Sequence, residues 1–341
     1  MKVKVGEITK IKTGKLDANA SSADGKYPFF TCSKDPLRIN SYSYDCECVL
    51  VAGNGDLNVK YYNGKFDAYQ RTYIIEDNSN GLLYMPYLYH FLEGYIGELR
   101  KQSIGGVIKY IKLGNLTDVL VELPSIEKQK YIVNLMNISL ELIELRKKTI
   151  DKLDSLVKAR FIEMFGDPLD GSAKYPIHQV GEVADTIDPQ PSHRTPPIDE
   201  SGIPYISIRD CNYKTGRIDF EGARKVSRKI LEEQSKRYTL HDGDFVIGKI
   251  GTIGNPVFIP PRDDYTLSAN VVLVQPNNNL VSPYFLKYSL ESGYVDRQFA
   301  EAKNSTSQAA FGIQKVRTIK VMNPDLNIQR KFDNFVKQVD K

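Results

Sequence analysis

The glycine-rich segment Gly248–Gly254 is where this sequence comes nearest to a cofactor-binding pattern. Its glycines match neither the Gly-x-Gly-x-x-Gly spacing of dinucleotide sites nor the P-loop, and no clear helix follows. An adenine methyltransferase would also need a segment of the Asn-Pro-Pro-Tyr type to hold its flipped base. The nearest candidate, Asn255–Phe258, lacks the second proline. We therefore interpret the glycine-rich segment as a turn between two strands, and we expect no cofactor.

Metal-dependent and nucleophilic chemistry also lack a complete set of side chains. Asp296 and Glu301–Lys303 resemble part of a metal-nuclease motif, but no convincing second carboxylate strand accompanies them. Cys46 and Cys48 lack the second pair of ligands that a zinc site would need. We therefore expect no catalytic residue and no metal site from the scattered cysteines and histidines, which are Cys32, Cys46, Cys48, Cys211, His90, His178, His193 and His241.

Polar side chains at the ends of predicted strands form the remaining candidate site. Phosphates are bound by Lys, Arg, Tyr, Ser and Thr, and bases are read by Arg, Lys, Asn and Gln in the grooves. Such residues follow the turn Gly53–Gly55 and occupy Arg100–Ser103, and matching polar segments occur in the second half. For each of them the alternative is a solvated loop without a ligand. The predicted nucleic-acid contacts are Asn54, Asn58, Lys60, Tyr61, Arg71, Lys101, Gln102, Ser103, Arg209, Lys249, Thr252, Asn304, Ser305, Thr306 and Gln308.

The segments that position these residues recur along the chain in one order. Val5–Ile8 returns as Val180–Val183, and Val49–Gly55 is answered by Phe245–Gly251. A last block repeats at a separation of 200 positions: Leu116, Pro124, Gln129 and Lys130 correspond to Val316, Pro324, Gln329 and Arg330. We infer two diverged copies of one domain.

Each copy has the pattern of a mixed α/β domain, so the expected fold class is α+β. Val49–Ala52 and Phe245–Ile247 are short apolar runs ending in glycine, which indicate buried strands before tight turns. Further strands are expected at Ala68–Glu76 and Ser268–Gln275, and helices at Pro86–Leu99 and Pro283–Phe299.

The segment between the copies predicts one long amphipathic helix. Residues 125–165 contain no glycine or proline, and their apolar residues recur every three or four positions. Ser125 suits the N-cap, and Gly166–Pro168 ends the helix. About 40 residues span roughly 60 Å, and so long a helix needs a packing partner. A shorter helix after Pro324 can pair with it antiparallel, which predicts domains at 1–122 and 167–322, a spacer helix at 123–166 and a C-terminal helix at 323–341.

Composition allows a polyanion as ligand without requiring one. The net charge is +4, and the chain holds 21 tyrosines and no tryptophan. Tyrosine suits nucleic-acid and protein surfaces, but it also fills β-rich cores. We find no signal peptide and no membrane-length apolar run, and the cysteine pattern favours a reducing compartment, so we expect a soluble, cytoplasmic protein.

Two similar domains held apart by a rod suit the reading of two half-sites on duplex DNA. The chain resembles the specificity subunit of type I restriction-modification systems, most clearly in Glu122–Val133, Ile143–Pro168 and Pro324–Gln329, and more weakly in Val3–Lys15 and Val49–Gly55. The resemblance implies two target recognition domains that read one bipartite site. It further implies docking of two modification (methyltransferase) subunits that hold S-adenosylmethionine and methylate adenine, a restriction subunit in the full complex, and no catalysis by this chain.

One feature departs from the family pattern, because the second helix is short. At most about 16 helical residues follow Pro324, whereas the central helix has about 40. Either the chain is truncated, or modification subunits or a second copy cover the exposed stripe, so self-association through the central helix is a hypothesis. A protein-interaction scaffold with two β-rich modules is the alternative function, and a self-contained methyltransferase or nuclease is a third.

Overall fold

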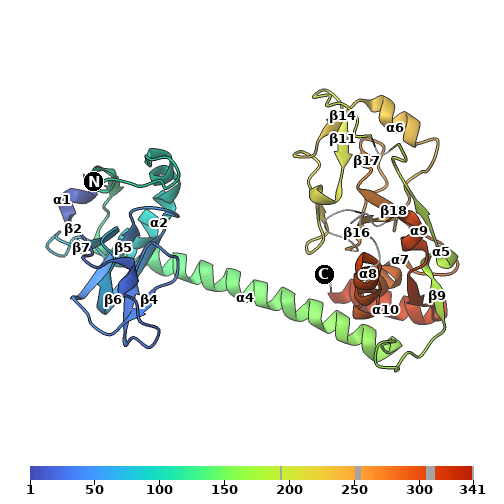
Figure 1. The fold of residues 1–341 in the computed structure, drawn as a ribbon, viewed down its shortest axis with the longest axis horizontal. Helices are drawn as coiled ribbons and strands as arrows, with labels where there is room; N and C mark the ends of the chain where they lie inside the picture. Colours follow the sequence, from blue (N-terminus) through green and yellow to red (C-terminus); the bar gives the residue numbers. More distant parts are fainter. Residues whose placement is uncertain (193, 250–254, 305–311, 340–341) are drawn as a thin grey trace. The chain divides into compact units, whose positions relative to one another are not determined.

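The computed structural model describes residues 1–192, 194–249, 255–304 and 312–339 (Figure 1). The chain divides into two compact units, Met1–Lys147 and Lys148–Lys341. The boundary falls within the 40-residue helix α4, Ile126–Phe165. None of the described helices is both long enough and apolar enough to cross a membrane.

Unit 1 is built on a six-stranded sheet in the order β2-β7-β5-β6-β3-β4. A separate two-stranded pair, β1 with β8, joins the start of the chain to the segment before α4. The strands are β1 Lys2–Lys4, β2 Thr9–Thr13, β3 Tyr27–Phe30, β4 Leu37–Ile39, β5 Tyr44–Ala52, β6 Val59–Ala68, β7 Thr72–Asp77 and β8 Leu120–Glu122. The α-helices are α1 Val5–Ile8, α2 Met85–Gln102 and α3 Gly114–Thr117, and Ala18–Ala20 form a 3-10 turn.

Strand β5 is buried on both faces, because its alternating side chains enter two cores. Val49 and Val51 pack with Ile75 and with Leu88 of α2, whereas Leu50 packs in a second cluster on the opposite face. Alternate residues of a strand point to opposite faces, so a continuous apolar run is what such a position requires. The predicted strand Val49–Ala52 is confirmed on this basis.

Unit 2 holds the same kinds of elements in the same order, with more insertions. Its sheets run β10-β18-β15-β16 and β14-β11-β17, with the pairs β9-β19 and β12-β13 beside them. The strands are β9 Ile177–Gln179, β10 Ala184–Ile187, β11 Ile203–Ile206, β12 Cys211–Asn212, β13 Arg217–Ile218, β14 Lys225–Val226, β15 Phe245–Gly248, β16 Val257–Phe258, β17 Thr266–Leu267, β18 Val271–Pro276 and β19 Lys320–Met322. The α-helices are α5 Val180–Val183, α6 Arg228–Gln234, α7 Pro283–Leu290, α8 Gly293–Asn304, α9 Ile313–Arg317 and α10 Leu326–Val339, and Ile208–Asp210 form a 3-10 turn.

A buried glutamine shows how closely the two units correspond. Gln129 accepts a hydrogen bond from the Tyr84 amide at 2.9 Å and donates to the Leu82 and Pro124 carbonyls. Gln329 repeats the pattern with the Ser282 amide at 2.7 Å and the Leu280 and Pro324 carbonyls. Both glutamines are fully buried. The predicted internal repeat is therefore confirmed at the level of individual hydrogen bonds.

The short helices α1 and α5, which both begin with the sequence Val-Gly-Glu, repeat in the same way. Glu7 accepts from the Lys4 amide at 3.1 Å, and Glu182 accepts from the Gln179 amide at 3.2 Å. The amide of the next residue in each copy donates to the residue just before β8 or β19: Val5 donates to the Val119 carbonyl, and Val180 donates to the Ile319 carbonyl. The start of each short helix is thereby fixed by equivalent bonds.

The predicted pairing of the long helix with a shorter C-terminal helix is confirmed within unit 2. Phe161 and Phe165 of α4 pack edge-on against Phe332 of α10, while Arg160 lies over the ring of Phe335. The contact positions advance in opposite directions along the two helices, so the pairing is antiparallel. Gly166 ends α4 at φ +79°, and a Cβ there would lie 1.9 Å from the Ser172 carbonyl oxygen. This position therefore requires glycine.

Two element boundaries differ from the sequence-based expectation. The predicted strands at Ala68–Glu76 and Ser268–Gln275 each begin with a turn, at residues 69–71 and 268–270, before β7 and β18 start. The predicted helix Pro283–Phe299 is two helices, because the chain turns at Glu291–Ser292 between α7 and α8. Polar residues at these turns satisfy backbone groups locally, which a search for apolar periodicity misses.

Candidate nucleic-acid interface

Four loops of unit 1 meet at one surface, which we call the loop cluster: residues 31–36, 53–58, 69–71 and 103–110. The Gly53 amide donates to the Arg71 carbonyl at 2.8 Å, and the Ile111 amide donates back to the Gly53 carbonyl at 2.9 Å. The Gly55 amide donates to the Lys109 carbonyl at 2.9 Å, and Asn58 Nδ2 donates to the Cys32 carbonyl at 2.8 Å. The 53–58 loop, one of the two segments predicted from the sequence, therefore lies beside the 103–110 loop that follows α2.

Asn54 and Arg71 are the predicted residues that the cluster presents most openly. Asn54 forms a β-bridge with Tyr110, which fixes its backbone while the side chain stays partly exposed. Arg71 is exposed in the turn between β6 and β7. Its guanidinium makes no hydrogen bond or ion pair with any residue that the structure describes. A fixed backbone with an unengaged cation is the arrangement that a phosphate contact needs.

Asn58, Lys60 and Tyr61 are more engaged in the fold. Asn58 braces its own loop, and its Oδ1 accepts a hydrogen bond from Lys60 Nζ. Burial lowers the pKa of Lys60. The Tyr61 hydroxyl donates to Glu47 at 2.7 Å. Partial burial and then the neighbouring carboxylate raise the pKa of Tyr61, so the hydroxyl remains protonated. These three side chains shape the surface more than they offer free donors to a ligand.

The end of α2 supplies the remaining predicted residues of unit 1. Lys101 Nζ lies 2.7 Å from Glu98, and Gln102 accepts from Asn115 at 3.1 Å. Ser103 Oγ donates to the Arg100 carbonyl at 2.6 Å and closes the helix. Arg100 itself bonds Asp56 at 2.7 Å, which ties α2 to the 53–58 loop. These exposed ion pairs are weak, so the cations can exchange partners at little cost.

The frame of the loop cluster recurs in unit 2. The Tyr69 amide donates to the Phe30 carbonyl at 2.9 Å in unit 1, and the Ser268 amide donates to the Ile206 carbonyl at 2.8 Å in unit 2. The bond between Gly53 and Arg71 is matched by one from the Lys249 amide to the Asn270 carbonyl at 2.9 Å. The ends of the equivalent strands are therefore held alike, although the loops between them differ.

Lys249 is a predicted contact residue, but its side chain is buried in the fold and paired with a carboxylate. It is 5% exposed, and its Nζ lies 2.6 Å from Asp188 Oδ2, whose side chain is 16% exposed. A buried cation with a carboxylate partner is not available to a phosphate without breaking that pair. We therefore leave Lys249 out of the proposed interface. No sequence pattern indicates this pairing, because Asp188 lies 61 residues earlier.

Of the other predicted residues of unit 2, Arg209 is well described, and the rest lie at or beyond the end of a described range. Arg209 is exposed in the 3-10 turn after β11. Asn304 is the last residue of α8, and its side chain is not described. Thr252, Ser305, Thr306 and Gln308 lie outside the described residues.

Two exposed features were missed by the sequence reasoning. One is the tip of the 103–110 loop in unit 1, where Val107 is fully exposed and Ile108 is 62% exposed. The other is a two-stranded ribbon in unit 2, β12 and β13, whose turn carries Tyr213 and Lys214. The signals were present, since Gly105-Gly106 and Thr215-Gly216 are turn pairs, but neither loop aligned with a repeated block.

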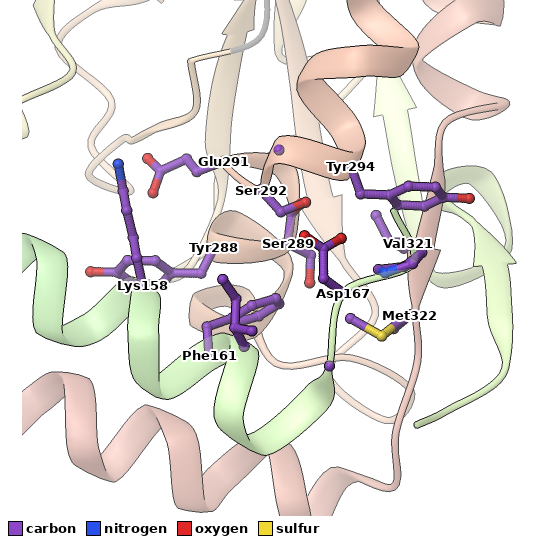
Figure 2. A pocket seen from close by; sticks show the side chains of 14 residues that line it. Lys158, Phe161, Asp167, Tyr288, Ser289, Glu291, Ser292, Tyr294, Val321 and Met322 are labelled. Carbon is purple, nitrogen blue, oxygen red and sulfur yellow. The ribbon is translucent and has the colours of Figure 1, made fainter. Parts of the chain in front are cut away.

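A partly open hollow lies in unit 2 (Figure 2). It is lined by α4, α7, α8 and β19, and Phe161, Val321 and Met322 make it mainly apolar. Ser289 Oγ borders it and has no hydrogen-bond partner in the described part of the chain. Its volume of about 110 Å³ is below the roughly 300–1,000 Å³ of small-molecule sites. No group of three or more potential metal ligands is present among the described residues.

The repeated α/β units and their exposed polar loops define a tandem recognition module. Comparison with known proteins gives its family: the model of the type I restriction modification DNA specificity domain matches residues 1–155 and 173–341. The chain therefore belongs to this family.

Curated relatives agree with the family. The EcoDI specificity subunit of Escherichia coli is 42% identical over 156 residues, which are 46% of this chain and 34% of that protein. The EcoBI subunit of the same organism is 18% identical over 276 residues, covering 74% of this chain and 58% of that protein. The chain thus spans between one third and three fifths of these two relatives. A putative specificity subunit of Haemophilus influenzae, S.HindORF215P, is 21% identical over 90% of this chain and 78% of its own length.

Solved structures show the same fold. The type I restriction-modification S subunit from M. genitalium aligns with all of this chain and 89% of its own, with a TM-score of 0.62 and 16% identity. A chain from a study of complex assembly and conformational transition of the type I R-M system aligns with all of this chain and 90% of its own, at a TM-score of 0.55 and 16% identity.

Proposed function

We propose that this chain is the non-catalytic DNA-specificity subunit of a type I restriction-modification enzyme in the cytoplasm. Each unit reads one half of a bipartite site in double-stranded DNA. The observation that carries the proposal is the loop cluster: equivalent backbone bonds hold the strand ends of both units, while the loops between them differ in length and charge. Two readers of different half-sites require a shared frame and divergent loops.

In this proposal α4 docks the modification subunits. The middle of the helix carries large apolar side chains at the surface, including Leu140, Leu142 and Ile143, which are 51–54% exposed. Apolar side chains exposed in one continuous stretch mark a protein interface. Modification subunits that methylate adenine, and a restriction subunit in the full complex, are the partners we propose, and a second copy of this chain is the alternative occupant.

The test is to co-express the chain with the modification subunit and to map methylated adenines in the host DNA. A split motif with a fixed gap supports the proposal, and methylation that does not depend on this chain refutes it. Binding of duplex DNA should also weaken steeply with salt, because each neutralised phosphate releases counterions.

Arg71→Ala sharpens this test at one residue. Loss of one phosphate contact should reduce the slope of log affinity against log salt by about 1. Lys10→Ala is the matched control, because Lys10 is exposed on β2, outside the loop cluster. Equal salt slopes for the two variants would contradict a phosphate contact by Arg71.

A further inference from the structure

The ribbon β12–β13 is a small, internally braced hairpin. Cys211 pairs with Ile218, and Asn212 pairs with Arg217. Asn212 Oδ1 accepts hydrogen bonds from the amides of Lys214 and Thr215 at 3.1 and 3.2 Å, and Gly216 supplies the left-handed residue at φ +66°. The turn is therefore held by the Asn212 side chain and by its own backbone, which leaves the side chains of its other residues free to face outward.

The ribbon occupies the position where unit 1 has part of its loop cluster. Strand β3 pairs in parallel with β6 and antiparallel with β4, and β11 pairs likewise with β17 and β14. Between these equivalent strands unit 1 has only residues 31–36, whereas unit 2 has residues 207–224. The short loop of unit 1 contacts Asn58 and the Arg71 carbonyl. The ribbon is therefore an insertion at a recognition-loop position.

The exposed side chains of the ribbon are cationic and unengaged. Arg209, Lys214 and Arg217 are exposed, Tyr213 is 46% exposed, and none of these side chains has a hydrogen bond or ion pair within the described residues. They border one shallow, open hollow.

The two carboxylates that border this hollow, those of Asp210 and Asp219, accept hydrogen bonds from the protein's own donors. Asp210 Oδ2 accepts from the Ser207 amide at 2.7 Å and from its hydroxyl at 2.9 Å. Asp219 Oδ1 accepts from the Gly222 amide at 2.8 Å. Three cations and a tyrosine therefore present unpaired donors on one side of a narrow β-ribbon, an arrangement that attracts a polyanion.

We propose that the β12–β13 ribbon enters the major groove of duplex DNA and that Lys214 and Arg217 read bases of the half-site assigned to unit 2. This inference rests on the proposed function. The major groove, about 12 Å wide, admits a two-stranded ribbon. Arg and Lys are the side chains that most often contact guanine there. Tyr213 and Arg209, beside them, are placed to hold the sugar-phosphate backbone.

The experiment uses the full chain with its modification subunit and compares Lys214→Ala and Arg217→Ala with the unchanged protein. Each variant should relax the methylated motif at one or two positions of one half-site and leave the other half and the gap unchanged. Affinity for the native site should fall by roughly 5- to 150-fold for a lost base contact, while binding to unrelated duplex changes much less. Lys236→Ala, an exposed lysine of unit 2 outside the ribbon, is the control and should keep the full motif.

Arg217→Lys separates base reading from charge. Lysine keeps the positive charge but loses the planar pair of donors that contacts a guanine edge. The variant should therefore relax one position of the motif without changing the salt slope of binding. Circular dichroism checks that each variant is folded, and the turn has no core side chain to lose.

The outcomes distinguish this inference from the proposed function. An unchanged motif and affinity in all three variants overturns the ribbon assignment, while the split site of the unchanged protein upholds the function. A uniform loss of affinity with a reduced salt slope shows phosphate contact and overturns base reading. If the unchanged protein directs no sequence-dependent methylation, the proposed function falls and the ribbon assignment falls with it.

Discussion

Replacing the buried Gln129 by methionine should destabilise unit 1 more than any surface substitution. The side chain is fully buried and links the loop at residues 82–84 to the start of α4: it accepts from the Tyr84 amide and donates to the Leu82 and Pro124 carbonyls, all at 2.8–2.9 Å. Methionine fills similar space, so the change removes hydrogen bonds without opening a large cavity. Three backbone groups lose their partner.

The cost follows from the number of orphaned groups. A buried polar group left without a partner costs about 1–3 kcal/mol. Leu82 lies at the surface, 59% exposed, so water can reach part of this region. We therefore use the lower end and expect about 3 kcal/mol. For a unit of this size that corresponds to a fall of roughly 6–12 °C in its melting temperature.

The assay is differential scanning calorimetry of the full chain, with hydrogen exchange to locate the change. Exchange should accelerate in the segment around Tyr84 and in the first turn of α4, and unit 2 should be unaffected. Gln329→Met should do the reverse, with a loss at least as large, because Gln329 also donates to Asn323 Oδ1 at 3.1 Å. Gln102→Met is the control, since Gln102 is exposed.

A fall of less than about 2 °C for Gln129→Met, below the value of a single net hydrogen bond, would refute the reasoning. So would equal destabilisation of both units by either variant, because the two glutamines act within separate units. In either case the matching hydrogen bonds of Gln129 and Gln329 would not contribute measurably to the stability of their own units.

Three further predictions concern other parts of the chain. Lys249→Met removes the cation that lies 2.6 Å from the mostly buried Asp188 carboxylate. Loss of this hydrogen bond between charged groups should cost about 1.5–3 kcal/mol of unit 2 stability, whereas a variant that stays stable but loses DNA affinity would return Lys249 to the interface. Burial raises the pKa of Asp333 against the opposing effects of its Ser282 hydrogen bond, Lys337 and Arg330. The folded state then holds this proton more tightly than the unfolded state, so the contribution of Asp333 to stability declines as pH rises from about 4 through the raised pKa. In urea unfolding, the free energy of unfolding of Asp333→Asn should rise relative to that of the unchanged protein from pH 4 to pH 7. A difference between the two proteins that does not vary with pH would count against this prediction. Leu142→Glu on α4 should abolish co-purification of the modification subunit without changing the melting temperature. Lys147→Glu on the same helix should leave co-purification intact, and equal co-purification with both variants would place the docking surface elsewhere.

The parts of the fold that the sequence predicted are those set by local pattern. The glycine-free and proline-free run 125–165 is helical almost to the residue, as α4 spans Ile126–Phe165. The repeated Pro-x-x-x-x-Gln marked both helix starts. The pattern could not reveal that each glutamine reaches back 45–49 residues to the loop before the preceding helix. Such links depend on tertiary packing, which periodicity does not encode.

The candidate site was predictable as a set of loops but not as a set of side chains. Arg71 and Lys249 are both cations beside the end of a strand, and the sequence does not distinguish them. The fold exposes the Arg71 side chain and buries that of Lys249 beside Asp188. The difference comes from one carboxylate 61 residues away in unit 2, which has no counterpart beside Arg71 among the described residues.

The chemistry of the shared frame explains why one insertion can change specificity without harming the fold. The bonds that close the strand ends, Tyr69 to Phe30 and Gly53 to Arg71 in unit 1, and Ser268 to Ile206 and Lys249 to Asn270 in unit 2, join backbone atoms only. Backbone bonds do not depend on side-chain identity, so the residues between them can diverge freely. The closure entropy of a loop rises only slowly with its length, so residues 207–224 replace a six-residue loop at modest cost. A ribbon can therefore be inserted at this position while the strands that carry it stay in register.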